Sequence, residues 1–128
     1  MNTVPYDALK NMLEAKQWTA ALARVDEMLA SNPCAAQLHL LRGQLIQLQS
    51  EHTAYTLDDV ALAFQNALAL DGTYFDALVE LMHFYDAVCP DMRQAVTYAT
   101  KVKTIALQAL DEARAVLDDK VPQAGESR

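Results

Sequence analysis

Glycine and proline are scarce in this sequence of 128 residues, with 3 and 4 copies. Such scarcity excludes collagen-like repetition and a disordered composition, and three scattered glycines do not form a phosphate-binding loop. β-Branched residues are also few: Val, Ile and Thr number 19, whereas Ala and Leu number 40. Ala and Leu favour helices, and β-branched residues favour strands. We therefore expect one all-α domain that buries a core without disulfides or metal.

Cysteine is limited to Cys34 and Cys89, which belong to no CxxC pair and have no histidine at ligand spacing. They are expected to be reduced thiols. No apolar run approaches the roughly 20 residues of a membrane span, and the first residues contain no apolar run typical of a signal peptide. We therefore expect a cytoplasmic protein.

Lys and Arg are absent between Arg42 and Arg93, an interval that contains eight acidic residues. The whole chain has 17 acidic and 10 basic side chains and a formal charge of −7. Such a balance repels a phosphate backbone and an anionic membrane, so neither nucleic acid nor a membrane is an expected partner. A solvated surface explains the acidic interval; a face that attracts a basic protein surface is the alternative.

Catalytic and metal-binding patterns are also lacking. His83 and Asp86 lie one helical turn apart, but two ligands fall short of the three or four that a metal site needs. Neither Cys34 nor Cys89 has a histidine within helical reach to act as its base. The sequence therefore predicts no enzyme, no metal site and no cofactor.

Apolar residues recur every three to four positions in six segments, which predicts six helices. They cover about 4–16, 19–31, 38–48, 56–71, 73–88 and 91–118. Thr19 is expected to cap the second helix, and Gly72 to end the fourth in a left-handed conformation. The folded domain is expected over 1–118, followed by a flexible tail over 119–128.

Two of the expected helices have stripes that predict which residues face the core. The stripe of the third helix consists of Leu38, Leu41, Leu45 and Leu48. The stripe of the last helix consists of Ala95, Ala99, Val102, Ala106, Ala109, Ala113 and Leu117.

The six helices repeat as three hairpins. Segments 18–33 and 57–72 align without a gap, and a third copy begins at Met92, at offsets of 39 and then 35 residues. Trp18 opens the second helix of the first copy, and Gly43 is a small residue in the first helix of the second. This pattern resembles the tetratricopeptide repeat, a helix-turn-helix unit of about 34 residues. The resemblance implies an α-solenoid of three hairpins with an extended C-terminal helix; an ordinary Ala/Leu-rich helical bundle is the alternative.

In the tetratricopeptide family, the first helices of successive repeats line a concave groove. Carried over by register, the groove-facing residues would be Tyr6, Lys10, Leu13, Gln37, Leu40, Gln44, Gln47, Asp76, Val79, His83 and Asp86. Their mixture of aromatic, amide and acidic groups suits a peptide or helix of a partner protein, and a plain solvated face is the alternative. Because Lys10 is the lone cation among them, a ligand that ends in a carboxylate is disfavoured.

The expected function is that of a protein-binding scaffold or adaptor. Chaperones for secreted bacterial proteins and toxin-neutralising immunity proteins are two subtypes of this hypothesis. A different class is a helical domain that acts only within a larger complex.

A further hypothesis is a structural assembly protein that forms a homodimer through its last helix. Four apolar residues lie off the main stripe of that helix and would form the dimer surface: Val96, Ile105, Leu107 and Leu110. In the alternative arrangement, the C-terminal half of this helix folds back over the third hairpin and the chain stays monomeric.

Overall fold

The computed structural model describes residues 3–49 and 54–121, and within these ranges the regular structure is entirely helical. Six α-helices follow one another, and one turn of π-helix, η1, continues the fifth. Their bounds are α1 Thr3–Glu14, α2 Trp18–Ser31, α3 Ala36–Gln47, α4 Leu57–Leu70, α5 Phe75–His83, η1 Phe84–Val88 and α6 Met92–Lys120. The all-α prediction is confirmed for the described residues.

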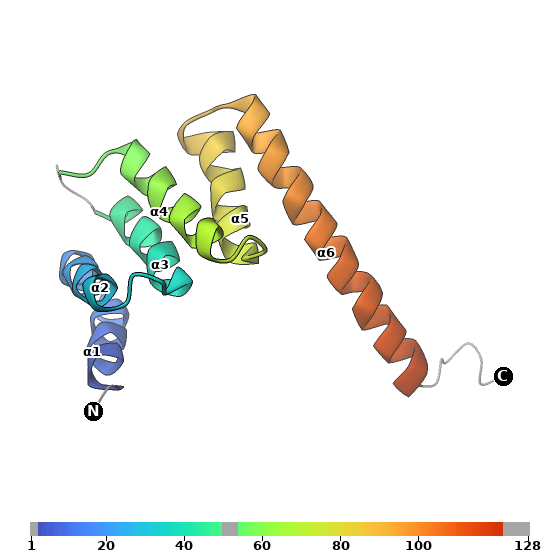
Figure 1. Ribbon diagram of the computed structural model, residues 1–128, viewed down its shortest axis with the longest axis horizontal. Coiled ribbons are helices and arrows are strands. Elements are labelled where there is room, and N and C mark those ends of the chain that lie inside the picture. Colours follow the sequence, from blue (N-terminus) through green and yellow to red (C-terminus); the bar gives the residue numbers. More distant parts are fainter. Residues whose placement is uncertain (1–2, 50–53, 122–128) are drawn as a thin grey trace.

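Each helix packs against its neighbours in the chain. Figure 1 shows α1 to α5 arranged in succession, with the C-terminal half of α6 extending away from all of them. The body of the molecule therefore consists of α1 to α5, η1 and the first half of α6. The remainder of α6 forms a projecting arm.

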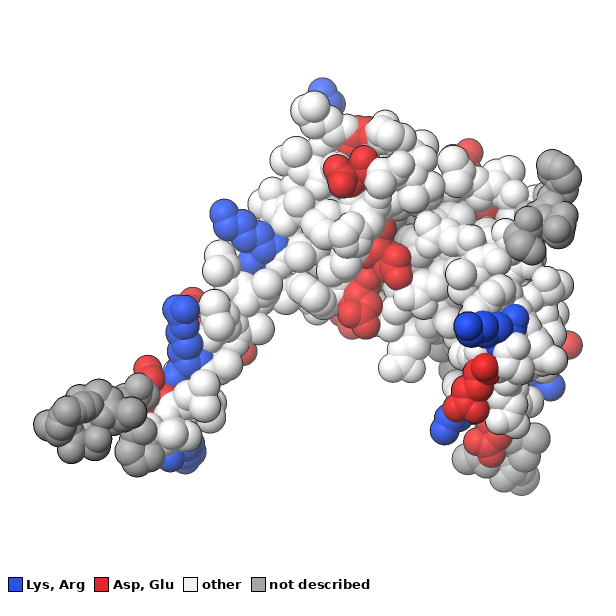
Figure 2. Space-filling view, turned by 180° about the vertical axis from the view of Figure 1, so that it is seen from behind, with Lys and Arg blue, Asp and Glu red and all other residues white. Residues whose placement is uncertain are grey.

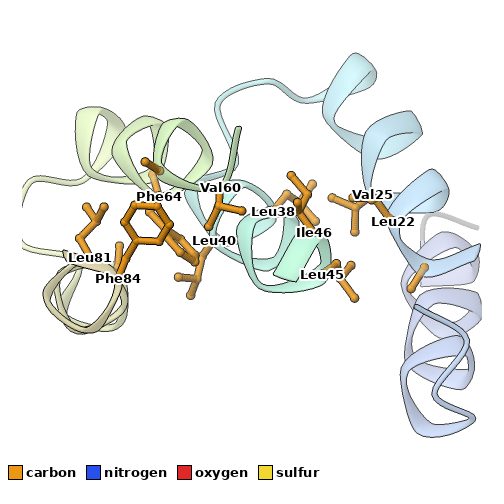
Figure 3. Packing of buried hydrophobic residues seen from close by; sticks show 14 of the residues in the cluster. Leu22, Val25, Leu38, Leu40, Leu45, Ile46, Val60, Phe64, Leu81 and Phe84 are labelled. Carbon is orange, nitrogen blue, oxygen red and sulfur yellow. The ribbon is translucent and has the colours of Figure 1, made fainter. Parts of the chain in front are cut away.

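One hydrophobic core runs through the body from α1 to η1. Its largest fully buried side chain is that of Phe64 on α4. Figure 3 shows Phe64 beside Phe84 of η1, and Val25 of α2 directed toward Ile46 of α3. Because this core reaches from the first hairpin to the third, it joins the three hairpins into one unit.

Gly43 allows α3 and α4 to approach closely. A Cβ atom at Gly43 would lie 2.5 Å from Cε1 of Phe64, and Phe64 has no exposed surface into which it could move. Only glycine therefore fits at position 43, where α3 packs against Phe64 of α4.

The start of α4 agrees with the prediction, but its end differs. The hydroxyl of Thr56 accepts a hydrogen bond from the amide of Asp59 at 3.4 Å, while the Asp59 carboxylate accepts one from the Thr56 amide at 2.8 Å. This reciprocal pair gives the Thr56 amide its acceptor and adds a second acceptor to the Asp59 amide, which also donates to the Thr56 carbonyl oxygen at 3.1 Å. The prediction of a left-handed Gly72 was wrong. No glycine of the described residues has a positive φ.

The prediction that Thr19 caps α2 was wrong. The helix begins at Trp18, with Gln17 at the N-cap position and no capping hydrogen bond from its side chain. The hydroxyl of Thr19 instead donates to Oε1 of Gln49 at 2.9 Å, which links α2 to the end of α3. The turn before α2 contains Lys16 with φ of 59°, so α1 ends at Glu14 rather than at Lys16.

The prediction of a single apolar stripe on α3 was also wrong in part. Leu38 and Leu45 are buried as expected, but Leu48 is exposed, and Leu40 and Ile46 are buried in addition. The reason is that α3 packs against α2 on one side and α4 on another. A helix enclosed from two directions buries a wider face than one stripe.

The helix expected over 73–88 is divided into two parts. Its α-helical part begins at Phe75, after Tyr74 at the N-cap position, and ends at His83. In η1, the amide of Cys89 donates to the carbonyl oxygen of Phe84, five residues earlier, at 2.8 Å. The wider turn accompanies the burial of Phe84.

The last helix, α6, begins where expected but packs over only half its length. The Asp91 side chain caps it by accepting from the amide of Gln94 at 3.2 Å. Ala95, Ala99 and Val102 are half-buried, whereas every residue over 106–121 is exposed. The expected stripe is therefore uncovered beyond Val102.

The end of α6 differs from two expectations. Since α6 is continuous to Lys120, its C-terminal half does not fold back over the third hairpin, and the helix extends two residues past the expected boundary at 118. Of the predicted tail over 119–128, Asp119 and Lys120 belong to α6 and Val121 is exposed, while residues 122–128 lie outside the described residues.

Candidate functional site

A hollow of about 540 Å³ lies between α5 with η1 on one side and the first turns of α6 on the other. We call it the α5–α6 hollow; it is lined by Met82, His83, Tyr85, Asp86, Pro90, Asp91, Met92, Ala95, Val96 and Ala99. Met92 and Val96 are 82% and 58% exposed. The hollow is thus mainly apolar and also contains two carboxylates and one imidazole.

Stacked aromatic rings hold the hollow in shape. Tyr85 of η1 and Tyr98 of α6 lie parallel, with their ring centroids 6.0 Å apart. Phe84 meets Tyr85 edge to face at 5.0 Å, and Gln65 of α4 donates to the Tyr85 hydroxyl at 3.3 Å. These contacts fix the packing of α6 on η1, so the hollow belongs to the packed body of the protein.

The same packing alters the acidity of two phenols. Burial raises the pKa of Tyr85 above its ordinary value of 10.0, and electrostatic repulsion from Tyr98 once that phenol ionises, and from Cys89, Asp91 and Asp58, adds to this rise. Burial also raises the pKa of Tyr98. Both side chains therefore remain neutral hydrogen-bonding groups at physiological pH.

Among the described residues, no Lys or Arg lines the hollow itself, and Arg93 directly follows Met92. Neither Lys nor Arg occurs among residues 43–92, while Asp86 and Asp91 lie in the hollow itself. Figure 2 shows acidic side chains over the middle of one face of the body, and basic ones along α6 and toward the opposite end of the molecule. A ligand of this hollow is thus favoured when it carries positive charge beside apolar groups.

The groove residues predicted on α5 and η1 divide between two places. His83 and Asp86 are exposed and lie in the hollow. Asp76 is exposed and Val79 is half-buried, and both lie on α5 outside the hollow. The structure therefore brings together two of these four residues.

The groove residues predicted on α3 have four different environments. Leu40 is buried in the core, and Gln37 is exposed. Gln44 donates from Nε2 to Oε2 of Glu80 on α5 at 2.7 Å. Gln47 lines a separate hollow of about 530 Å³ that also includes Tyr55. Gln44 thus forms a hydrogen bond to α5, one of the helices that form the α5–α6 hollow.

The groove residues predicted on α1 lie on the first helix of the array. Tyr6 and Lys10 are exposed, and Leu13 is half-buried against the core. None of the three lines the α5–α6 hollow.

The predicted dimer surface of α6 does not form one face. An α-helix turns by about 100° per residue, so Val96, Leu107 and Leu110 lie within about 60° of one another, while Ile105 lies on the opposite side. The first three are exposed and Ile105 is half-buried. Val96 also lines the hollow, which joins this surface to His83 and Asp86.

Sequence reasoning missed several residues of the hollow, chiefly Met82, Tyr85 and Met92. Periodicity alone places Met82 and Tyr85 in a core-facing stripe, and Met92 stands out only as the start of a repeat copy. Its position directly after Pro90-Asp91 places Met92 in the first turn of a helix, but no pattern around it shows that this turn is exposed.

Comparisons with protein-family models, with curated proteins and with solved structures find no match for this chain. No helix of the described ranges is both long and apolar enough to cross a membrane. Within the same ranges, no three metal-ligating side chains come together. The residues of the site therefore supply the argument for function.

Proposed function

We propose that this chain is a protein–protein interaction module that holds a helical or extended segment of a partner in the α5–α6 hollow. The observation that carries the proposal is the hollow itself, an open apolar site with Met92 and Val96 exposed beside Asp86 and Asp91. Exposed apolar surface with a polar rim marks interaction sites. The partner segment would place apolar side chains in the hollow and basic ones next to the carboxylates.

Tetratricopeptide-like hairpins are part of this proposal. The successive packing of α1 to α6 and the close approach at Gly43 support it. In such an array each hairpin covers the next, and the last one has an outer side that no further hairpin covers. The α5–α6 hollow lies on this last hairpin, where an added helix would continue the array.

A binding selection tests the proposal. A display library of short helical peptides would be selected against the wild-type chain, and the binders would then be measured on a Val96→Glu variant by fluorescence anisotropy. We expect Leu, Met or Phe anchors flanked by Lys or Arg in the selected peptides, and a loss of affinity of roughly tenfold or more in the variant.

Leu62→Glu is the matched control, since Leu62 on α4 is 52% exposed and lies outside the hollow. It introduces the same charge without altering the site, so binding should be retained. Selected peptides that are acidic, or that bind the Val96→Glu variant as tightly as the wild type, would contradict the proposed function.

A further inference from the structure

Methionine side chains form part of the α5–α6 hollow. The sequence has five methionines, of which Met1 lies outside the described residues. Met12 and Met28 are half-buried and pack against the hydrophobic core. Met82 and Met92 instead line the hollow. The candidate site therefore contains two thioethers, a group that dissolved oxidants attack.

The two thioethers of the hollow differ in their access to solvent. Met92 is the first residue of α6 and directly follows the N-cap residue Asp91. Its side chain is 82% exposed, the largest fraction among the large hydrophobic residues of the described ranges, whereas Met82 is half-buried. An oxidant in solution must touch the sulfur atom in order to react with it. Met92 is therefore the thioether of the site that such an oxidant reaches most readily.

We propose that oxidation of Met92 to its sulfoxide by hydrogen peroxide closes the α5–α6 hollow to its partner. In this step the thioether sulfur donates an electron pair to one peroxide oxygen, and the S–O bond forms as the O–O bond breaks. The second oxygen takes up the proton of the first and leaves as water. Sulfur loses two electrons and the peroxide gains them, so no further reactant is needed.

The sulfoxide opposes binding because it changes the polarity of the site. A thioether is apolar and adapts its shape to a bound apolar group, whereas a sulfoxide is polar and accepts hydrogen bonds from water. An apolar side chain of the partner would displace that water, and an unpaired polar group is costly to bury. The carboxylates of Asp86 and Asp91 are themselves acceptors and cannot take the place of the lost water. The oxidised hollow should therefore bind an apolar anchor weakly.

This inference rests on the proposed function and adds a means of regulating it. Methionine sulfoxide is reduced by dedicated reductases, so the closed site can be opened again. The cysteines are exposed but do not line the hollow, so the inference assigns them no part in it.

The test measures the affinity of the full-length chain for a selected peptide before and after treatment with hydrogen peroxide. The peroxide is removed before the peptide is added, and dithiothreitol reverses disulfide and sulfenic acid formation at the cysteines. Mass spectrometry should show Met92 oxidised several-fold faster than Met12 and Met28. The affinity should fall roughly tenfold or more in the chains that carry the Met92 sulfoxide. Methionine sulfoxide reductases specific for the two sulfoxide epimers should restore it.

Two variants locate the effect, and each is compared with its own untreated sample. Met92→Leu removes the sulfur, so peroxide should change its affinity by less than about twofold. Met28→Leu is the matched control at the core, and it should lose affinity on treatment as the wild type does. Circular dichroism checks that every treated chain is folded.

Three results overturn the inference and leave the proposed function standing. They are an oxidised wild type that binds as tightly as the untreated one, a Met92→Leu chain that loses as much affinity as the wild type, and a Met92 that is oxidised no faster than Met28. An untreated wild type that binds no peptide of the library contradicts the proposed function itself, and this inference with it.

Discussion

Tyr85 and Tyr98 stack with their ring planes only 6° from parallel and their centroids 6.0 Å apart. One ring belongs to η1 and the other to α6, so this pair determines how the last helix leaves the body. Between these two elements lies the hollow that we propose as the binding site. Its shape thus depends on a contact between two aromatic side chains that are 13 positions apart in the sequence.

Removing one ring should loosen the last hairpin. Tyr98→Ala is expected to lower the free energy of unfolding by about 1–3 kcal/mol, because it deletes a half-buried ring and its stacking partner remains. Tyr98→Phe keeps the ring and should change stability by less than about 1 kcal/mol. Urea denaturation measures both. Equal losses in the two variants would show that the hydroxyl, and not the stacked ring, is important.

Stability should fall in alkaline solution as these phenols ionise. Burial raises the pKa of Tyr85 and Tyr98 in the folded chain above the ordinary value of 10.0. The folded state therefore retains protons that the unfolded state releases, and the resulting stabilisation is complete below pH 10 and lost as the pH rises through the folded pKa values. Denaturation midpoints measured across this range should decline less steeply for Tyr85→Phe than for the wild type. An unchanged slope would argue against this assignment.

Gly43 and Gly72 should respond in opposite ways to the same substitution. A methyl group at Gly43 would meet the buried Phe64 ring at 2.5 Å, so Gly43→Ala should cost about 1–3 kcal/mol through overpacking. At Gly72 the nearest atom to such a methyl group is the Leu68 carbonyl oxygen at 3.9 Å. Gly72→Ala should therefore be neutral, or stabilising by up to about 1 kcal/mol. Thermal unfolding of both variants checks the contrast, and a neutral Gly43→Ala would show that the α3–α4 crossing can widen.

A charge pair between α2 and α3 supplies a fourth prediction. Nε of Arg42 donates to Oδ1 of Asp26 at 2.7 Å, and the guanidinium lies 5.4 Å from the centre of the Tyr55 ring. A double-mutant cycle with Asp26→Ala and Arg42→Ala should give a coupling free energy of about 0.5–1.5 kcal/mol, because the pair is only partly shielded from water. Coupling within error of zero would mean that solvent screens this pair fully.

Binding of basic partners should weaken as salt rises. Charges on a surface are screened beyond roughly 8 Å at physiological ionic strength. The affinity of a selected basic peptide should therefore fall between low and high salt, and the decline should be smaller for Asp86→Asn. A salt-independent affinity would assign binding to the apolar contacts alone.

Periodicity in the sequence predicted much of the fold. The segments expected from about 56 and 91 begin within one residue of α4 and α6, because the spacing of apolar residues changes where a helix begins. The core face of α3 was harder to predict. Leu40 and Ile46 are buried by helices on two sides, and no pattern within α3 alone encodes both neighbours.

The candidate site was predicted less well than the fold. His83, Asp86 and Val96 are singled out by the sequence for different reasons, and their meeting in one hollow depends on the angle between α5 and α6. That angle follows from η1 and the stacked tyrosines, which are features of three-dimensional packing. Met92 is prominent because no part of the described chain covers the first turn of α6, and periodicity within a sequence does not show this.

The central claim is that a protein segment occupies the α5–α6 hollow, and oxidation of Met92 tests it most directly. This thioether is 82% exposed, whereas Met12, Met28 and Met82 are partly buried. Mass spectrometry would measure the oxidation rate of each methionine in the free chain and with a selected peptide bound. The account predicts rapid oxidation of Met92 in the free chain and protection of several-fold or more when the hollow is filled. A Met92 that is oxidised equally fast in both samples would contradict it.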